Sequence, residues 1–227
     1  MLRPLLDLLL PAECGGCGLP GAVLCPDCEA LLWAPARVYP PCCGTGPPIY
    51  ALGTYQGSLR AALLAYKERA RRDLATPLGN ALASALLHFR SLSPERAQVD
   101  EMWLVPVPSR GAAAGRRGGQ HVELVARRAA AGLARAGVAA AVAPALRMGL
   151  GVRDSVGLAA AARQVNLAGK VRPRRAGLPP AGTAVVLIDD VVTTGTTVAA
   201  CTAALLRTGV TVPAIVVLAA AGCHTPS

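Results

Sequence analysis

Apolar runs of strand length alternate with segments in which apolar residues recur at helical spacing, from residue 49 almost to the end of the chain. The apolar runs predict strands at 51–55, 102–107, 138–142, 185–188 and 210–218. The helical repeats predict helices at 59–66, 78–89, 122–136 and 197–207, with shorter ones at 5–10 and 158–163. Strands that alternate with helices favour an α/β fold built on a parallel sheet.

The run from Val185 to Ile188 is apolar at every position, which is typical of a central parallel strand covered on both faces. Asp189 and Asp190 follow it directly. Ligands of open α/β sheets bind at the carboxyl ends of the strands. We therefore expect the strand to end at Ile188 and both acids to point toward a ligand.

A turn rich in threonine follows the two acids and opens the helix predicted at 197–207. Gly195 permits a backbone geometry that a Cβ would obstruct, and the flanking threonines offer hydroxyls and a helix N-cap. The helix start directs N–H groups and a positive dipole end into the turn, which suits a phosphate. The stretch consists of Val191, Val192, Thr193, Thr194, Gly195, Thr196 and Thr197.

Carboxylates beside a phosphate-binding turn suit a sugar phosphate, because they accept hydrogen bonds from vicinal hydroxyls and attract a divalent cation. The sequence has no Gly-Lys-Ser/Thr phosphate loop and no Gly-x-Gly-x-x-Gly spacing, which speaks against nucleotide hydrolysis and hydride transfer. The plainer alternative is a buried strand followed by two solvated acids and a threonine-capped helix.

Two Cys-x-x-Cys pairs near the start of the chain predict a tetrahedral zinc site formed by Cys14, Cys17, Cys25 and Cys28. A redox pair and an inert cysteine-rich turn are the alternatives. Cys42 and Cys43 are adjacent and cannot easily aim both sulfurs at one metal, so we interpret them as part of a turn. The expected domains are a zinc-knuckle module at 1–34, a linker rich in Pro and Gly at 35–48, and a main domain at 49–227.

The net charge of +10 lies in the main domain, because residues 1–60 carry three basic and four acidic side chains. Such an excess attracts pyrophosphate or nucleic acid, although a solvated basic surface is the commoner cause. The turn stiffened by Pro106 and Pro108 presents Ser109 and Arg110 as an edge for pyrophosphate. A small-residue loop at 111–119 then contains Arg116 and Arg117 and fits a closing loop or a plain surface loop.

The first apolar run is broken by Pro4 and Asp7 and is too short for the core of a signal peptide. No other apolar run reaches the length of a membrane span. We therefore expect a cytoplasmic protein without a membrane span.

The thirteen residues from Val185 to Thr197 resemble the phosphoribosyl pyrophosphate (PRPP) signature of type I phosphoribosyltransferases. The resemblance implies that Asp189 and Asp190 bind the ribose 2′ and 3′ hydroxyls and that residues 193–197 hold the 5′-phosphate. Members that act on 6-oxopurines usually carry an aspartate where this chain has Thr193. That difference speaks against hypoxanthine or guanine as the acceptor.

Over nearly its whole length the chain resembles the competence protein F (ComF) family, in the order of zinc knuckles, Lys67 patch, Val-Pro-Val-Pro turn, Arg-Gly loop, Arg-x-x-Asn and Asp-Asp motif. The resemblance implies a Rossmann-like parallel sheet of the type I phosphoribosyltransferase fold, with a small hood. It places Lys67, Ser109 and Arg110 near pyrophosphate. Many members have a third Cys-x-x-Cys where only Cys42-Cys43-Gly44 stands here, which supports the four knuckle cysteines as the complete ligand set. Gly119 departs from the Arg-Gly-Phe-Asn-Gln of the family loop and weakens any base-recognition role for it.

The function that this resemblance implies is transfer of phosphoribose from PRPP, with Mg²⁺, to an acceptor that the sequence does not identify. Asp189, Asp190, Arg110 and Lys67 are the expected catalytic residues. The alternatives are a PRPP sensor without catalysis and a single-stranded DNA-binding accessory protein of competence and DNA uptake. The oligomeric state is left open.

Overall fold

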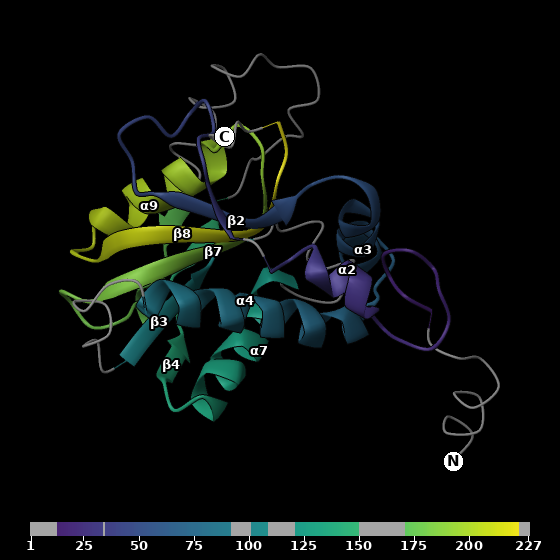
Figure 1. The fold of residues 1–227 in the computed structure, drawn as a ribbon. Helices are drawn as coiled ribbons and strands as arrows, with labels where there is room; N and C mark the ends of the chain where they lie inside the picture. Colours follow the sequence, from purple (N-terminus) through teal and green to yellow (C-terminus); the bar gives the residue numbers. More distant parts are fainter. Residues whose placement is uncertain (1–12, 34, 92–100, 109–120, 150–170, 223–227) are drawn as a thin grey trace.

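The computed structural model describes residues 13–33, 35–91, 101–108, 121–149 and 171–222, and the strands of these residues form a mostly parallel central sheet (Figure 1). The strand order is β1-β2-β8-β7-β3-β4. Only β1 runs antiparallel to its neighbour in this described sheet. The bounds are β1 Ala36–Val38, β2 Ile49–Thr54, β3 Glu101–Pro106, β4 Ala139–Val142, β7 Ala184–Val192 and β8 Thr211–Ala220.

Helices cover both faces of the sheet, as a doubly wound α/β fold requires. Helices α4 (Ala75–Ser91) and α7 (His121–Arg135) pack together on one face, and α9 (Thr196–Leu206) covers the other (Figure 1). Each face has its own apolar cluster: Ile188 of β7 belongs to the cluster with α4 and α7, and Leu187 belongs to the cluster with α9. The predicted fold class is therefore confirmed.

The remaining elements lie around this sheet. Helix α3 (Gly57–Glu68) follows β2, and the short helix α2 (Pro26–Ala30) belongs to the cysteine-rich segment. Strands β5 (Leu146–Met148) and β6 (Val171–Pro173) form a separate antiparallel pair that packs on the α9 side. Two 3₁₀ turns complete the described elements, η1 (Arg72–Leu74) and η2 (Arg175–Gly177).

The predicted main-domain elements are present, and most differ from their predicted bounds by only one to three residues at an end. The predicted end of the central strand at Ile188 is wrong, because β7 continues to Val192 and includes both acids. The predicted linker at 35–48 contains β1, which pairs with β2 at the edge of the sheet. The helices expected at 5–10 and 158–163 lie outside the described residues. In the part of the chain that the structure describes, no helix has the length and apolar character needed to cross a bilayer.

Candidate functional site

The direction of the chain connections reverses between β3 and β7, which are adjacent parallel strands. From β3 the chain passes through α7 to β4 on one side, whereas from β7 it passes through α9 to β8 on the other. Ligands of doubly wound sheets bind in the crevice outside the carboxyl ends of the strands at such a reversal point. The topology therefore places the candidate site at the ends of β3 and β7, between the first turns of α7 and α9.

Asp189 and Asp190 lie in the second half of β7 and are both buried. Successive residues of a strand point to opposite faces of the sheet. Asp190 faces the side of α3 and α7, where it meets Lys67 and His121. Asp189 faces α9, where burial and the negative charge of Asp189 raise the pKa of Cys201. The two acids are thus directed to different surroundings.

Asp190 is the centre of a charged cluster built from three elements. Its Oδ2 atom accepts a hydrogen bond from Lys67 Nζ at 2.8 Å and lies 2.7 Å from Nε2 of His121. Its Oδ1 atom accepts the N–H of Val191 at 2.7 Å. The Tyr66 hydroxyl donates to the backbone oxygen of His121 at 2.7 Å and so fixes the start of α7 against α3. The arrangement orients the Asp190 carboxylate through contacts on both of its oxygens.

The surroundings move the pKa values of the two acids in opposite directions. Burial alone would raise the pKa of Asp190, but the hydrogen bond to His121 and the charge of Lys67 outweigh it and hold this pKa well below its usual range. Burial, together with the charge of Asp190, raises the pKa of Asp189 well above its usual range, although the N–H of Asp190 donates to it at 2.8 Å. Asp190 is therefore the first of the pair to ionise.

Lys67 keeps its charge in this cluster. Burial opposes the protonated form, but the negative charge of Asp190 and the hydrogen bond to it more than compensate and raise the pKa of Lys67. About a third of the side chain stays accessible, with a relative exposure of 37% against 12% for Asp190. The predicted site residues Lys67 and Asp190 are thus in contact, and the cation retains a solvent-accessible side.

The threonine-rich turn after β7 connects the sheet to α9. Gly195 has a φ of 81°, in the left-handed region that favours glycine, and it is the residue that precedes the helix. The hydroxyls of Thr194 and Thr196 lie 2.9 Å apart, and Thr193 is exposed. The predicted threonine N-cap is wrong, because Gly195 occupies the cap position and no described side chain caps the helix. The N–H groups of such a helix start suit an anion.

The carboxyl end of β3 supplies the other wall of the crevice. The N–H of Val107 donates to the backbone oxygen of Ile188 at 2.8 Å, so β3 and β7 stay paired up to this point. Pro108 follows and is buried. The other residues predicted to bind pyrophosphate lie outside the described residues, and they are Ser109, Arg110, Arg116 and Arg117.

His121 is the site residue that the sequence analysis did not identify. It is the first residue of α7 and bonds Asp190 across 69 positions of sequence. The one sequence signal for His121 is its position. It is the first residue of α7, the helix that follows β3, and β3 ends at the reversal point of the sheet. That signal is weak without knowledge of which strands are neighbours.

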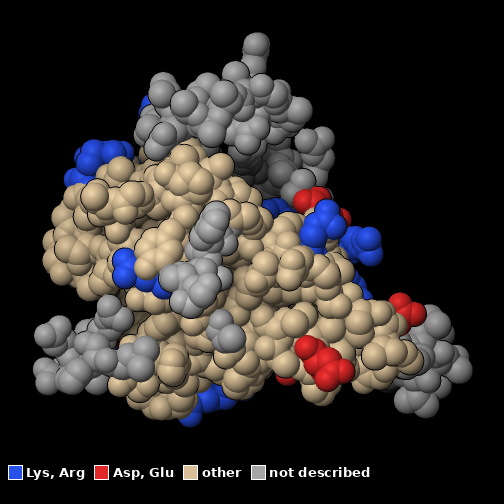
Figure 2. Space-filling view, turned by 45° about the horizontal axis from the view of Figure 1, so that its top comes forward, with Lys and Arg blue, Asp and Glu red and all other residues tan. Residues whose placement is uncertain are grey.

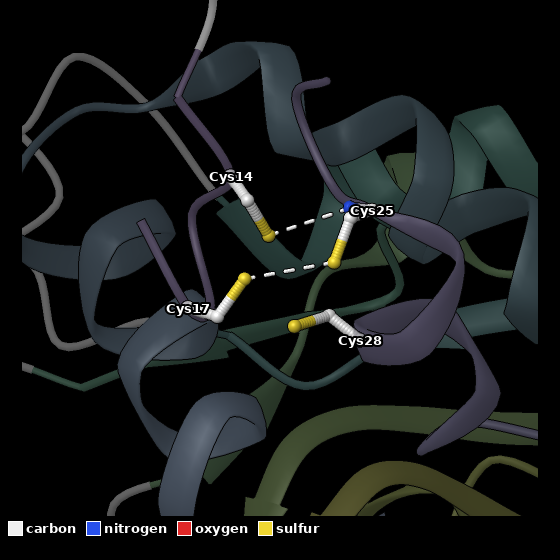
Figure 3. A group of neighbouring side chains, drawn as sticks. All are labelled: Cys14, Cys17, Cys25 and Cys28. Atoms are coloured by element: carbon white, nitrogen blue, oxygen red, sulfur yellow. Dashed lines mark hydrogen bonds between the residues drawn. The ribbon is translucent and has the colours of Figure 1, made fainter. Parts of the chain in front are cut away.

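The four knuckle cysteines converge as predicted (Figure 3). Their sulfur atoms all lie within 4.8 Å of one another, and those of Cys17 and Cys25 are 3.6 Å apart. A tetrahedral zinc–thiolate site with bonds of about 2.3 Å separates its sulfurs by about 3.8 Å. Burial raises the pKa of Cys14, but the N–H groups of Cys17, Cys25 and Gly16 outweigh it and lower this pKa to about 6. The cluster can hold a metal such as zinc.

The cysteine-rich segment packs against the elements that carry Lys67. Cys14 and Cys28 belong to the same apolar cluster as Leu59 of α3 and Leu74 of η1. A Cβ on Gly16 would lie 2.8 Å from the Cys28 sulfur and 3.0 Å from the backbone oxygen of Ser58, so the knuckle backbone sits directly on the start of α3. The four-cysteine cluster and the α3 side of the candidate site are therefore parts of one packed unit.

Comparisons with known proteins place few constraints on this chain. No model of a known protein family matches the sequence, and no curated protein matches it. Among solved structures, six chains match, one of them the crystal structure of an adenine phosphoribosyltransferase. That match has 16% sequence identity and a TM-score of 0.38 and covers 84% of this chain and 86% of the other. The resemblance to the ComF family stays a prediction.

Proposed function

We propose that this chain binds PRPP and transfers its phosphoribosyl group to an acceptor, as a phosphoribosyltransferase-like protein of the ComF type. The observation that carries the proposal is the sequence of groups at the end of β7. An ionised, oriented carboxylate at Asp190 is followed within five residues by an uncapped helix start at Gly195, at the point where the sheet reverses. A carboxylate beside an anion-binding turn suits a sugar that carries a phosphate.

The 5′-phosphate is assigned to the turn at 193–197, where α9 begins without a side-chain cap and the hydroxyls of Thr194 and Thr196 lie 2.9 Å apart. The ribose hydroxyls are assigned to the acid pair, with Asp190 as the principal acceptor. A carboxylate has about four lone-pair positions. Three are used by Lys67, His121 and Val191, which leaves one on Oδ1 for a sugar hydroxyl. Asp189 supports this carboxylate by accepting the N–H of Asp190.

The pyrophosphate is assigned to the β3 side, near Lys67 and Pro108, with Ser109, Arg110, Arg116 and Arg117 as further proposed contacts. Lys67 supports this placement because it is a charged and partly exposed ammonium group. In the reaction, the bond from the anomeric carbon to pyrophosphate breaks and a bond to the acceptor atom forms. Positioning and neutralisation of the leaving charge are the main demands on the protein.

The described acids do not fit a resident Mg²⁺ site. Oδ2 of Asp190 already contacts two nitrogen donors, and the pKa of Asp189 is raised, so the pair offers no free set of anionic oxygens. We propose that Mg²⁺ enters as a complex with PRPP. The Cys14, Cys17, Cys25 and Cys28 cluster is assigned a structural Zn²⁺, because all four thiols are used and no open position for a substrate is needed.

Calorimetric titration with PRPP and Mg²⁺ tests the proposal. Asp190→Asn is expected to weaken binding at least tenfold, because the sugar loses its charged acceptor and Lys67 loses its partner. Asp73→Asn is the matched control. Asp73 is also an aspartate in an ion pair, with Arg71, but it lies on η1, away from the candidate site. Equal affinity of Asp190→Asn and wild type for PRPP would contradict the assignment. A screen of nucleobases for pyrophosphate release then tests catalysis.

A double variant of the two acids separates PRPP binding from the DNA-binding alternative. Binding of single-stranded DNA through phosphates would weaken steeply with salt and survive the double change Asp189→Asn with Asp190→Asn. On the face drawn in Figure 2, the lysine and arginine side chains of the described residues lie in separate groups and not in one continuous track. No observation on this face favours DNA over the sugar phosphate.

A further inference from the structure

The segment from Pro40 to Cys43 packs directly on the turn proposed to hold the 5′-phosphate. The N–H of Cys42 donates to the backbone oxygen of Thr194 at 2.9 Å. The Cys43 thiol donates to the backbone oxygen of Gly195 at 3.4 Å. These contacts join parts of the chain that are more than 150 positions apart. The segment was interpreted from sequence as a turn within a linker, and the structure places it at the site.

Both contacts use carbonyl groups of the turn, and this determines where the adjacent N–H groups point. In a trans peptide unit, the C=O and the following N–H point in opposite directions. When the oxygens of Thr194 and Gly195 face the segment at 40–43, the N–H groups of Gly195 and Thr196 face away from it. The Gly195 oxygen also accepts the N–H of Ala199 at 3.0 Å, which is the first hydrogen bond of α9. The helix and the segment at 40–43 therefore together direct these two N–H donors away from the segment.

Gly195 shows how tightly the segment fits. A Cβ on this residue would collide with the Cys43 sulfur and lie 3.0 Å from Cβ of Pro40. Its φ of 81° also disfavours any side chain at this position. The space that a side chain would need is thus filled by Cys43, which packs against the apolar cluster that includes Val198 of α9.

We propose that the segment at 40–43 is part of the phosphate site and that Cys43 is a positioning residue for the turn at 193–197. The inference rests on the proposed function, because it specifies how the same turn is held ready for the 5′-phosphate. It also makes the stretch between the cysteine-rich segment and the main domain a contributor to ligand binding. Cys43 acts through the backbone of Gly195 and does not touch the ligand.

The test compares Cys43→Ala, Cys43→Ser and Cys42→Ala by calorimetry with two probes, ribose 5-phosphate and inorganic pyrophosphate. Cys43→Ala removes a weak thiol donor from an oxygen that keeps its hydrogen bond to Ala199, so the Kd for ribose 5-phosphate is expected to rise about twofold. Cys43→Ser keeps a hydroxyl donor and is expected to recover part of the affinity. Cys42→Ala is the matched control, because Cys42 contacts the turn through its backbone N–H.

Pyrophosphate separates positioning from a general loss of structure, since it is assigned to the β3 side of the crevice. Its Kd is expected to stay unchanged in Cys43→Ala. The inference is overturned if Cys43→Ala binds ribose 5-phosphate as wild type does, or if both probes weaken equally. If wild type binds ribose 5-phosphate and only the Cys43 comparison fails, the proposed function stands. If wild type binds neither probe nor PRPP, both proposals fail.

Discussion

The ion pair between Lys67 and Asp190 gives the most quantitative prediction about the candidate site. We expect a double-mutant cycle with Lys67→Met and Asp190→Asn to show a coupling free energy of about 1–1.5 kcal/mol. Hydrogen bonds to charged groups contribute about 1.5–3 kcal/mol and exposed ion pairs about 0.2–1 kcal/mol. With 37% of the Lys67 side chain and 12% of the Asp190 side chain exposed, this pair lies between the two cases.

The same chain offers a control pair on its surface. Arg127 and Glu123 form an ion pair one turn apart on α7, with exposures of 59% and 22%. The cycle with Arg127→Met and Glu123→Gln is expected to give only about 0.3–0.5 kcal/mol. Both cycles are measured by urea unfolding near neutral pH, followed by circular dichroism. A Lys67–Asp190 coupling no larger than that of the control would refute the interpretation of Asp190 as the centre of a buried charged cluster.

The pH dependence of this coupling has a definite sign. The pKa of Asp190 is lower in the folded protein than its ordinary value of about 3.9. The stabilisation is therefore complete above that ordinary value and is lost as the pH falls through the folded pKa. The coupling is expected to be unchanged between about pH 7 and pH 8 and to decline only under strongly acidic conditions.

Three further changes test other parts of the structure. Asp189→Asn is expected to raise the free energy of unfolding, because burial and the charge of Asp190 disfavour the ionised form of Asp189 in the fold and an amide carries no charge. Below about pH 3.9 Asp189 is protonated in both the folded and the unfolded chain, and the stability of the wild type falls as the pH rises from there through the folded pKa of Asp189. The stability advantage of Asp189→Asn is therefore expected to grow with pH. A variant that is less stable than wild type at pH 8 would contradict this expectation. Chelation is expected to release about one zinc per chain and lower the melting temperature, measured by elemental analysis and calorimetry, because Cys14 and Cys28 share a core with Leu59 and Leu74. Gly79→Ala is expected to destabilise the fold by about 1–3 kcal/mol in urea unfolding, because the added Cβ would collide with the Cβ of Arg128. Helix propensity alone predicts the opposite, a more stable protein. A more stable variant would therefore show that α4 and α7 can separate without cost.

The main-domain strands and helices could be predicted because each has a local cause. Apolar runs such as 185–188 specify strands buried on both faces, and repeats such as that of α7 specify a helix with one apolar side. The convergence of the four cysteines was likewise predictable, since the spacing of two Cys-x-x-Cys pairs is itself a local signal. Strands β1, β5 and β6 have only three residues each, which is too short for a period to be recognised.

The site itself depends on contacts that no local pattern contains. β7 continues through Asp189 and Asp190 because Lys67 and His121 offset the cost of burying the Asp190 charge, and they do so across 123 and 69 positions of sequence. The sequence alone places two carboxylates just after a strand and predicts that both point toward a ligand, but it contains no signal for the contacts that bury them within the strand. The contact of the segment at 40–43 with Gly195 is of the same kind, because it depends on β1 pairing with the edge of the sheet.

A crystal structure of the chain with PRPP bound would show where the sugar phosphate lies. We expect the 5′-phosphate within hydrogen-bonding distance of the N–H groups of Gly195, Thr196 and Thr197, and a ribose hydroxyl on Asp190. A PRPP molecule bound elsewhere, with the turn at 193–197 free of phosphate, would contradict it.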